Sequence, residues 1–188
     1  MSETPSDEAL MLAYRDGDVE AFEILYRRYR GPMYRYLLRQ CGSTAVAEEL
    51  FQDVWTKLIQ ARKRYQVKAS FSTFVYHMAH NRLIDHYRKH KGVVPASYDE
   101  NDDEGGHAQA DDGPSVEVQT DRRRKLQDLL QAISALPEAQ REAFLMREES
   151  GMSIEEIAEA TGVNPETAKS RLRYAINKLR QTLGQAES

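Results

Sequence analysis

The sequence predicts an all-α protein: two small helical domains joined by an acidic disordered linker, the second domain containing a helix-turn-helix. Three observations support this prediction. Apolar residues recur at i, i+3, i+4 spacing, strand signals are nearly absent, and residues 92–121 are rich in Gly, Pro, Asp and Ser with few large apolar side chains. The 188 residues fit two small domains. We expect boundaries at 8–91, 92–121 and 122–183.

The charge is distributed unevenly along the chain. The net charge is −4, but the segment 92–121 contains nine acids and no Lys or Arg. Outside it, 26 basic residues stand against 21 acidic ones, a net charge of +5. The two helical parts are therefore mildly basic, which is compatible with nucleic acid as a partner.

Several classes of protein are excluded or disfavoured by simple features. Cys41 is the single cysteine, so disulfide frameworks and cysteine zinc sites within one chain are excluded. No apolar run approaches the ~20 residues that a membrane span needs, and MSETPSDEAL lacks the features of a secretory signal. We expect a cytoplasmic protein without a stable membrane insertion of its own.

The N-terminal part is predicted to be a series of helices separated by Asp16-Gly17-Asp18, Gly31-Pro32 and Cys41-Gly42-Ser43. Ser43 is a suitable N-cap for the next helix, whose apolar stripe is predicted to face the core. The stripe consists of Ala47, Leu50, Phe51, Val54, Trp55, Leu58 and Ile59, and the opposite flank carries Glu49, Gln52, Asp53 and Thr56. That flank is either an ordinary solvated face or a docking surface.

The next segment, ARKRYQVKASFSTFVYHMAHNRLIDHYRKHK, combines aromatic and basic residues. A helix is predicted from about 72 to 89, with His77, Asn81, Asp85 and Arg88 on one side. Aromatic rings that stack on bases and cations that pair with phosphates suit melted nucleic acid, although a solvated basic face is the simpler alternative. His77, His80, His86 and His90 have spacings that allow a metal clip, but no acid or cysteine completes a set, so no metal or other cofactor is predicted.

The C-terminal part has the signals of a helix-turn-helix. Pro137 and Gly151 delimit one helix, and Ser153 with Glu156 forms a capping box that opens the next. Gly162 supplies a left-handed turn, after which Asn164 caps a last helix with Pro165 at its first position. Two short helices joined by a tight turn containing Gly are typical of this motif.

The second helix of the pair has a basic outer side, which includes Lys169, Arg171 and Arg173. A DNA major groove admits one helix, and its base edges and phosphates accept hydrogen bonds from Arg and Lys. The first helix can remain acidic because it braces the second. The sequence therefore predicts duplex recognition, with a packed helical hairpin as the alternative.

These motifs resemble those of extracytoplasmic-function (ECF) sigma factors of bacterial RNA polymerase. The stretch ALPEAQREAFLMREESGMSIEEIAEATGVNPETAKSRLRYAINKLR is similar to the promoter-binding region of that family. Independently, AEELFQDVWTKL resembles its core-polymerase-binding helix, and FSTFVYHMAHNRLIDHYRKHK resembles the segment that melts and reads the upstream edge of the transcription bubble. The resemblance covers about residues 8–91 and 122–183.

The resemblance implies a non-enzymatic initiation factor that binds core RNA polymerase and promoter DNA, with an anti-sigma factor as a further partner. It also assigns residues to three surfaces. The core-binding set is Glu49, Leu50, Gln52, Asp53 and Trp55; the minus-ten set is Tyr65, Phe71, Phe74, Asn81, Arg82, Asp85 and Arg88, with the 65–71 loop helping to capture a flipped base; and the minus-thirty-five set is Thr167, Lys169, Ser170, Arg171, Arg173 and Tyr174.

Two positions depart from the family pattern. Phe74 stands where the family often has Trp, and Tyr174 stands where it usually has a second Arg, while Arg173 occupies a variable position. The linker fits the implied role: about 30 residues extend to at most ~100 Å, and two promoter elements about two helical turns apart are separated by roughly 70 Å.

Other functions remain as alternatives at this point. A stand-alone helix-turn-helix regulator would bind duplex DNA tightly without polymerase and would usually dimerise, and a helical adaptor would need no basic recognition helix. A metal-dependent nuclease acting through the histidine-rich helix would need an acidic metal cluster, and none is evident in the sequence.

Overall fold

The computed structural model of the chain describes residues 4–90 and 116–186. These residues form eight α-helices and one short 3-10 helix, and no strand occurs among them, so the all-α prediction is confirmed. The helices are α1 (Asp7–Arg15), α2 (Val19–Cys41), α3 (Thr44–Ala61), η1 (Arg62–Arg64), α4 (Phe71–Lys89), α5 (Val116–Ser134), α6 (Glu138–Ser150), α7 (Ile154–Thr161) and α8 (Pro165–Ala186). None of the helices in the described residues is long and apolar enough to cross a membrane.

Side-chain caps fix the starts of the N-terminal helices. Ser6, Asp18, Ser43 and Ser70 each accept a hydrogen bond from the backbone N–H three residues later, at the first residues of α1, α2, α3 and α4. Each cap satisfies a backbone donor that has no partner inside its helix. The predicted breaks at Asp16-Gly17-Asp18 and Cys41-Gly42-Ser43 are therefore confirmed.

The predicted break at Gly31-Pro32 is wrong, because α2 continues through both residues from Val19 to Cys41. Proline removes one backbone hydrogen bond and usually kinks a helix. Here both halves of the helix are anchored in the core: Leu25 and Tyr29 are buried before the proline, and Met33 and Leu37 after it. Burial of these side chains outweighs the local penalty.

Aromatic side chains make up much of the core of the N-terminal domain. Tyr14 and Phe22 meet with ring centroids 4.7 Å apart, and Tyr29 meets Phe71 edge to face at 4.9 Å. Such pairs contribute about 0.5–1.5 kcal/mol beyond the burial of their area. The four helices α1 to α4 therefore share one well-connected core.

The helix-turn-helix is formed as predicted. Both hydrogen bonds of the capping box between Ser153 and Glu156 are present at the start of α7, and Gly162 ends that helix with φ +70°. Asn164 then caps α8, since its Oδ1 accepts a hydrogen bond from the Thr167 N–H at 2.8 Å. The sharp turn depends on Gly162, because other residues rarely adopt this left-handed conformation.

The start of the C-terminal domain differs from the prediction. Residues 92–115 of the expected linker lie outside the described residues, but α5 begins at Val116, inside the range 92–121. An ion pair with helical i, i+4 spacing, between Asp121 and Lys125 at 3.1 Å, spans the expected boundary. Such pairs favour the helical conformation. The prediction of the linker relied on composition, which did not reveal the first turns of α5.

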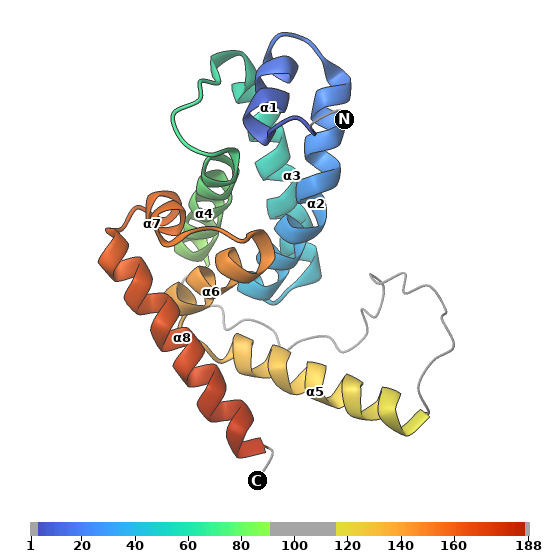
Figure 1. Ribbon diagram of the computed structural model, residues 1–188, viewed down its shortest axis with the longest axis vertical. Helices are drawn as coiled ribbons and strands as arrows, with labels where there is room; N and C mark the ends of the chain where they lie inside the picture. Colours follow the sequence, from blue (N-terminus) through green and yellow to red (C-terminus); the bar gives the residue numbers. More distant parts are fainter. Residues whose placement is uncertain (1–3, 91–115, 187–188) are drawn as a thin grey trace.

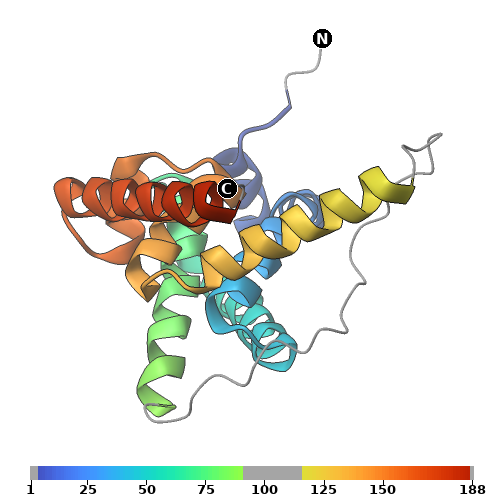
Figure 2. The same cartoon turned by 90° about the horizontal axis from the view of Figure 1, so that it is seen from below.

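The two domains pack against each other (Figure 1). Helix α6 lies against α2, and α7 lies against α4. Helix α8 packs on α6 and α7 and then extends away from the N-terminal domain, while α5 projects from the body as a long arm (Figure 2). Part of the surface of α4 is therefore covered by the helix-turn-helix.

Candidate polymerase and nucleic-acid interfaces

The predicted polymerase-binding residues on α3 fall into two groups. Glu49 and Gln52 are exposed, and Asp53 is partly exposed. Leu50 and Trp55 instead lie in the core, with 2% and 5% of their surface exposed. In this structure the first group presents polar atoms to solvent, whereas the second holds α3 in place.

Trp55 lies at the centre of an aromatic cluster between α2 and α3. Its ring meets those of Phe22 at 5.9 Å, Tyr26 at 4.9 Å and Phe51 at 6.1 Å. The indole N–H is buried and has no hydrogen-bond partner among the described residues. Substitution of Trp55 would consequently remove core contacts that hold α3 in place, and would thereby disturb the exposed surface of α3.

Arg82 connects the predicted polymerase face to the predicted minus-ten face. Its guanidinium forms an ion pair with Asp53 on α3, and Nη1 lies 3.6 Å from Asp85 Oδ2 on its own helix. Hydrogen bonds between charged groups are stronger than those between neutral ones. Arg82 therefore has a structural partner, and Asp53 is held in a fixed position.

The exposed side of α4 carries His77, Asn81 and Arg88. The amide nitrogen of Asn81 lies 3.1 Å from His77 Nε2, and His77 Nδ1 lies 3.0 Å from the backbone oxygen of Ala160 in α7. Both contacts are satisfied when Nδ1 carries the proton, because the amide NH₂ donates and the carbonyl accepts. The helix-turn-helix thus already engages this face.

A cavity of about 420 Å³ opens beside α4 and the loop that precedes it. Tyr65 and Phe74, two of the predicted residues, line it and meet edge to face at 5.0 Å. Tyr65 is only 4% exposed, and its hydroxyl has no hydrogen-bond partner among the described residues. Phe71 does not line the cavity; it is fully buried and packs against Tyr29.

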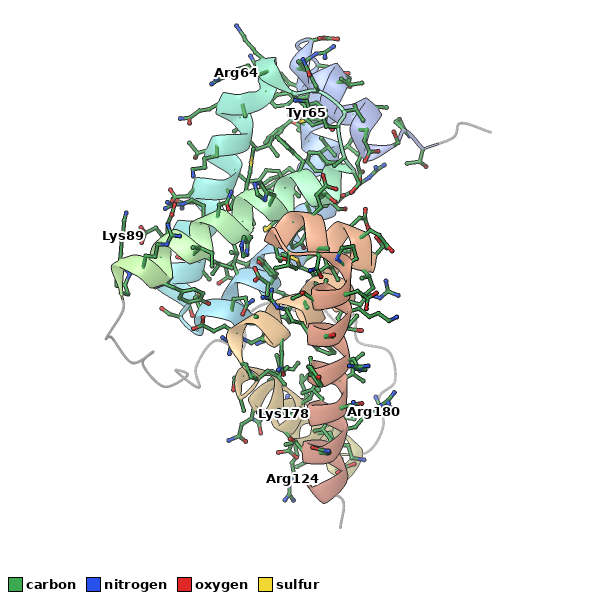
Figure 3. The ribbon with its side chains drawn as sticks, turned by 90° about the vertical axis from the view of Figure 1, so that its left-hand side faces the viewer. Arg64, Tyr65, Lys89, Arg124, Lys178 and Arg180 are labelled. Atoms are coloured by element: carbon green, nitrogen blue, oxygen red, sulfur yellow. The ribbon has the colours of Figure 1, made fainter. Side chains whose placement is uncertain are left out.

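Two further residues of the cavity wall, Lys68 and His77, lie in the predicted 65–71 loop and on the predicted polar side of α4. Arg64 was not singled out from the sequence, although the basic run before Tyr65 was an available signal for it. Glu159 also lines the cavity, although it belongs to α7. Only the packing of the two domains brings that carboxylate to this position. Figure 3 shows Arg64 and Tyr65 near one end of α4 and Lys89 at the other.

The predicted recognition surface of α8 is largely open. Lys169, Arg173 and Tyr174 are exposed, and the Arg173 guanidinium lies 5.3 Å from the centre of the Tyr174 ring. Thr167 and Ser170 are partly exposed. Lys178 and Arg180 add further exposed cations where α8 extends away from the N-terminal domain (Figure 3).

Arg171 is placed differently from the other predicted residues of α8. It lines a smaller cavity of about 190 Å³ between the two domains, together with His80, Glu138 and Glu142. A guanidinium among carboxylates is electrostatically favoured there. In this arrangement Arg171 faces the N-terminal domain, while Lys169 and Arg173 face solvent.

The histidines of α4 have individual roles in the packing. The rings of His86 and His90 stack at 4.3 Å, and burial together with the nearby His90 charge lowers the pKa of His86 below its usual value. His80 contacts a glutamate of α6. Within residues 4–90 and 116–186, no group of three or more potential metal ligands occurs.

Family models match both domains of this chain. Sigma-70 region 2 matches residues 25–93, and Sigma-70, region 4 matches residues 126–179. The RNA polymerase sigma factor CarQ of Myxococcus xanthus is 32% identical over 178 residues, covering 94% of this chain and 97% of that protein. The ECF RNA polymerase sigma factor RpoE of Cereibacter sphaeroides is 34% identical over 176 residues, covering 92% of each chain.

Solved structures agree on the fold. CnrH, in complex with the cytosolic domain of CnrY, superimposes with a TM-score of 0.70 at 18% identity, covering 98% of this chain and 100% of that one. RpoE of Bartonella quintana, in complex with the anti-sigma factor NepR, gives 0.66 at 22% identity, covering 87% and 96%.

Two helical domains that match sigma-70 regions 2 and 4, the second with a helix-turn-helix, define a sigma-70-type transcription initiation factor. Within that class, the chain belongs to the extracytoplasmic-function sigma factors of bacterial RNA polymerase. The stand-alone regulator is not favoured.

Proposed function

We propose that the cavity beside α4 receives a base of the melted minus-ten element. The observation that carries this proposal is the unpartnered, buried hydroxyl of Tyr65 in a cavity lined by Phe74, Arg64 and Lys68. A flipped base offers an aromatic face for stacking and polar edges for the hydroxyl, and the cations suit the adjacent phosphates. Asn81 and Arg88 extend this surface along α4, which Arg82 and Asp85 help to order.

We further propose that the open side of α8 reads the minus-thirty-five element as duplex. Lys169, Arg173 and Tyr174 are presented to solvent near the start of the helix, where a helix-turn-helix inserts into the major groove. The partly exposed Thr167 and Ser170 lie on the same helix. Arg171 joins this set once the two domains separate.

On α3, we propose that Glu49, Gln52 and Asp53 contact core polymerase, with Leu50 and Trp55 supporting the helix from within. The domain limits 8–91 and 122–183 describe the parts that carry these roles, with α5 preceding the second part. The chain has no catalytic role in this proposal and acts in the cytoplasm. Two similar folds are seen in complexes with CnrY and with the anti-sigma factor NepR, which supports an anti-sigma partner here as well.

The experiment that tests this function is transcription by sigma-free bacterial core polymerase on genomic DNA fragments, with and without the protein. Discrete transcripts that require the protein are expected, and their start sites locate the two promoter elements. Glu49→Ala and Gln52→Ala, made together, should reduce transcript yield and core affinity, whereas Lys57→Ala, an exposed position on the same helix, serves as the control. Specific duplex binding by the protein alone, with no transcripts on any fragment, would instead support the stand-alone regulator.

A further inference from the structure

The 65–71 loop, which forms part of the cavity wall, is fixed at its two ends. Its first residue, Tyr65, follows η1, and its last, Phe71, begins α4. The middle of the loop, residues 66–69, makes no hydrogen bond to any part of the chain that the structure describes, and Val67 is 52% exposed. The position of Tyr65 in the cavity wall therefore depends on what holds the two ends.

Both ends are bound by side chains of α1. The Glu8 Oε1 atom accepts a hydrogen bond from the Phe71 N–H at 2.7 Å, and Arg15 Nη1 donates to the Tyr65 backbone oxygen at 3.4 Å. Glu8 and Arg15 are about two helical turns apart, so they lie on one face of α1, roughly 10 Å from each other along its axis. Helix α1 packs against η1 and α4, which flank the loop (Figure 1). One helix thus connects the two ends of the loop.

The first turn of α4 is held especially firmly. The Phe71 N–H is one of the donors that have no partner inside the helix, and the Glu8 carboxylate lies at the positive end of the helix dipole, where its hydrogen bond is charge-assisted. Beside it, the Tyr29 hydroxyl donates to Asp7 at 2.5 Å and lies 2.8 Å from the Ser72 hydroxyl of α4. Burial, and then the hydrogen bond to Asp7, raises the pKa of Tyr29, so Ser72 is the donor in the second contact.

Helix α1 is itself anchored in the N-terminal domain. Its buried side chains are Leu10, Met11 and Tyr14. Asp7 also forms an ion pair with Arg28 of α2 at 2.5 Å. Neither Glu8 nor Arg15 lines the cavity, so an effect of these residues on a bound base has to pass through the loop. Burial, and then the charges of Glu8 and Asp7, raises the pKa of Tyr65, which keeps its hydroxyl protonated and able to donate.

We propose that Glu8 and Arg15 are positioning residues for base capture: by holding Phe71 and Tyr65, they keep the 65–71 loop in the conformation that receives the flipped base. This inference rests on the proposed role of the cavity. Without the two contacts the loop samples more conformations, and the cost of ordering it reduces the affinity for the base. The loss is confined to DNA whose base enters the cavity, because the surfaces of α3 and α8 do not depend on this loop.

The test uses holoenzyme assembled from core polymerase and the full chain. Fluorescence anisotropy measures its affinity for a labelled fork-junction DNA, which presents the minus-ten element of a promoter mapped by transcription as a single strand. Each minus-ten base is replaced in turn by an abasic site, and the position with the largest loss of affinity marks the captured base. The affinity for intact DNA divided by the affinity for this abasic DNA is the base-capture ratio.

The variants separate positioning from stability. Glu8→Ala removes the acceptor of the Phe71 N–H, whereas Glu8→Gln keeps an oxygen there. Arg15→Met removes the donor to Tyr65 and keeps an apolar side chain. Glu20→Ala, at an exposed position in the first turn of α2, is the control. A loss of folded protein lowers the affinities for intact and abasic DNA equally, so it leaves the base-capture ratio unchanged.

We expect a base-capture ratio of about 5 to 150 for the original protein, the range that stacking of one base supplies. Glu8→Ala should lower this ratio about 2- to 10-fold, and Arg15→Met should lower it less, because its hydrogen bond is long at 3.4 Å. Glu8→Gln and Glu20→Ala should retain it. An unchanged ratio in Glu8→Ala, or an equal fall in Glu20→Ala, would refute the positioning role. A ratio near one at every minus-ten position in the original protein would instead refute base binding by the cavity.

Discussion

The two proposed nucleic-acid faces of this sigma factor differ in how far the free chain presents them. On α8, Lys169, Arg173 and Tyr174 are exposed. On α4, the His77 side chain is hydrogen-bonded to the backbone oxygen of Ala160 in α7, and Glu159 of α7 lines the adjacent cavity. The proposed duplex-reading surface is thus open to solvent. The proposed strand-reading surface is only partly open: Asn81 and Arg88 are exposed, but α7 borders the cavity. The difference follows from the packing of α7 against α4.

The largest effect on promoter binding is expected from a substitution on the exposed surface of α8. Arg173→Ala should weaken promoter binding by the polymerase holoenzyme about 5- to 150-fold, because a good base contact supplies about 1–3 kcal/mol of discrimination. Competition binding against a promoter with an altered minus-thirty-five element measures this loss. Arg180→Ala, which removes an exposed cation farther along the same helix, should cost far less. Equal losses in the two variants would show that α8 contributes charge and not sequence readout.

The next effect concerns the link between α3 and α4. A double-mutant cycle of Asp53→Ala and Arg82→Ala should give a coupling of about 1.5–3 kcal/mol in the free energy of unfolding, because a charged hydrogen bond is lost from a partly buried position. Urea titration provides the measurement. The exposed pair of Glu23 and Arg27, 3.6 Å apart, is the matched comparison, with an expected coupling of about 0.5 kcal/mol or less. A value that small for Asp53 and Arg82 would mean that Arg82 is free to contact DNA.

The proposed base-binding role of the cavity beside α4 can be tested by removing the Tyr65 hydroxyl. Tyr65→Phe removes a buried hydroxyl that has no partner among the described residues, so the free energy of unfolding should stay the same or rise by up to about 1 kcal/mol. Open-complex formation should nevertheless fall about 2- to 10-fold if that hydroxyl bonds a base. Permanganate footprinting of the promoter measures the open complex. Tyr14→Phe, outside the cavity, is the control, and an unchanged open complex with Tyr65→Phe would remove this hydroxyl from base recognition.

The smallest expected effect is the pH dependence of the contact between α7 and α4. Burial alone would raise the pKa of Glu156, but hydrogen bonds from Ser70 and Ser153 outweigh it and hold the pKa below 4.5. A lowered pKa in the folded state adds stability that is present above pH 4.5 and is lost as the pH falls below that value. Solvent screening keeps this contribution to roughly 0.5 kcal/mol or less.

The urea concentration at the midpoint of unfolding should therefore fall more between neutral pH and acid for the original protein than for Glu156→Gln. Glu155→Gln, at the exposed neighbouring position on α7, should retain the steeper drop. Identical pH profiles for Glu156→Gln and the original protein would show that Ser70 does not stabilise the carboxylate.

Local signals in the sequence determined most of the secondary structure. The Ser153 capping box, Gly162 and Asn164 each act within a few residues, so their consequences were predictable and are seen in the structure. Gly31-Pro32 was misjudged because burial of Leu25, Tyr29, Met33 and Leu37 overrides a local breaker. That burial depends on the neighbouring helices α1, α3 and α4, and propensity does not describe it.

For the sites, the sequence by itself determined which residue types are present and which helices carry them. Tertiary structure alone decided which are accessible: Leu50 and Trp55 point into the core, Arg82 pairs with Asp53, and Arg171 faces the other domain. It also placed Glu142 between Tyr36 and His80, groups 106 and 62 residues away along the chain. Helix spacing fixes neighbours three or four residues apart, whereas contacts over such separations depend on how whole helices pack, and no local pattern encodes that packing.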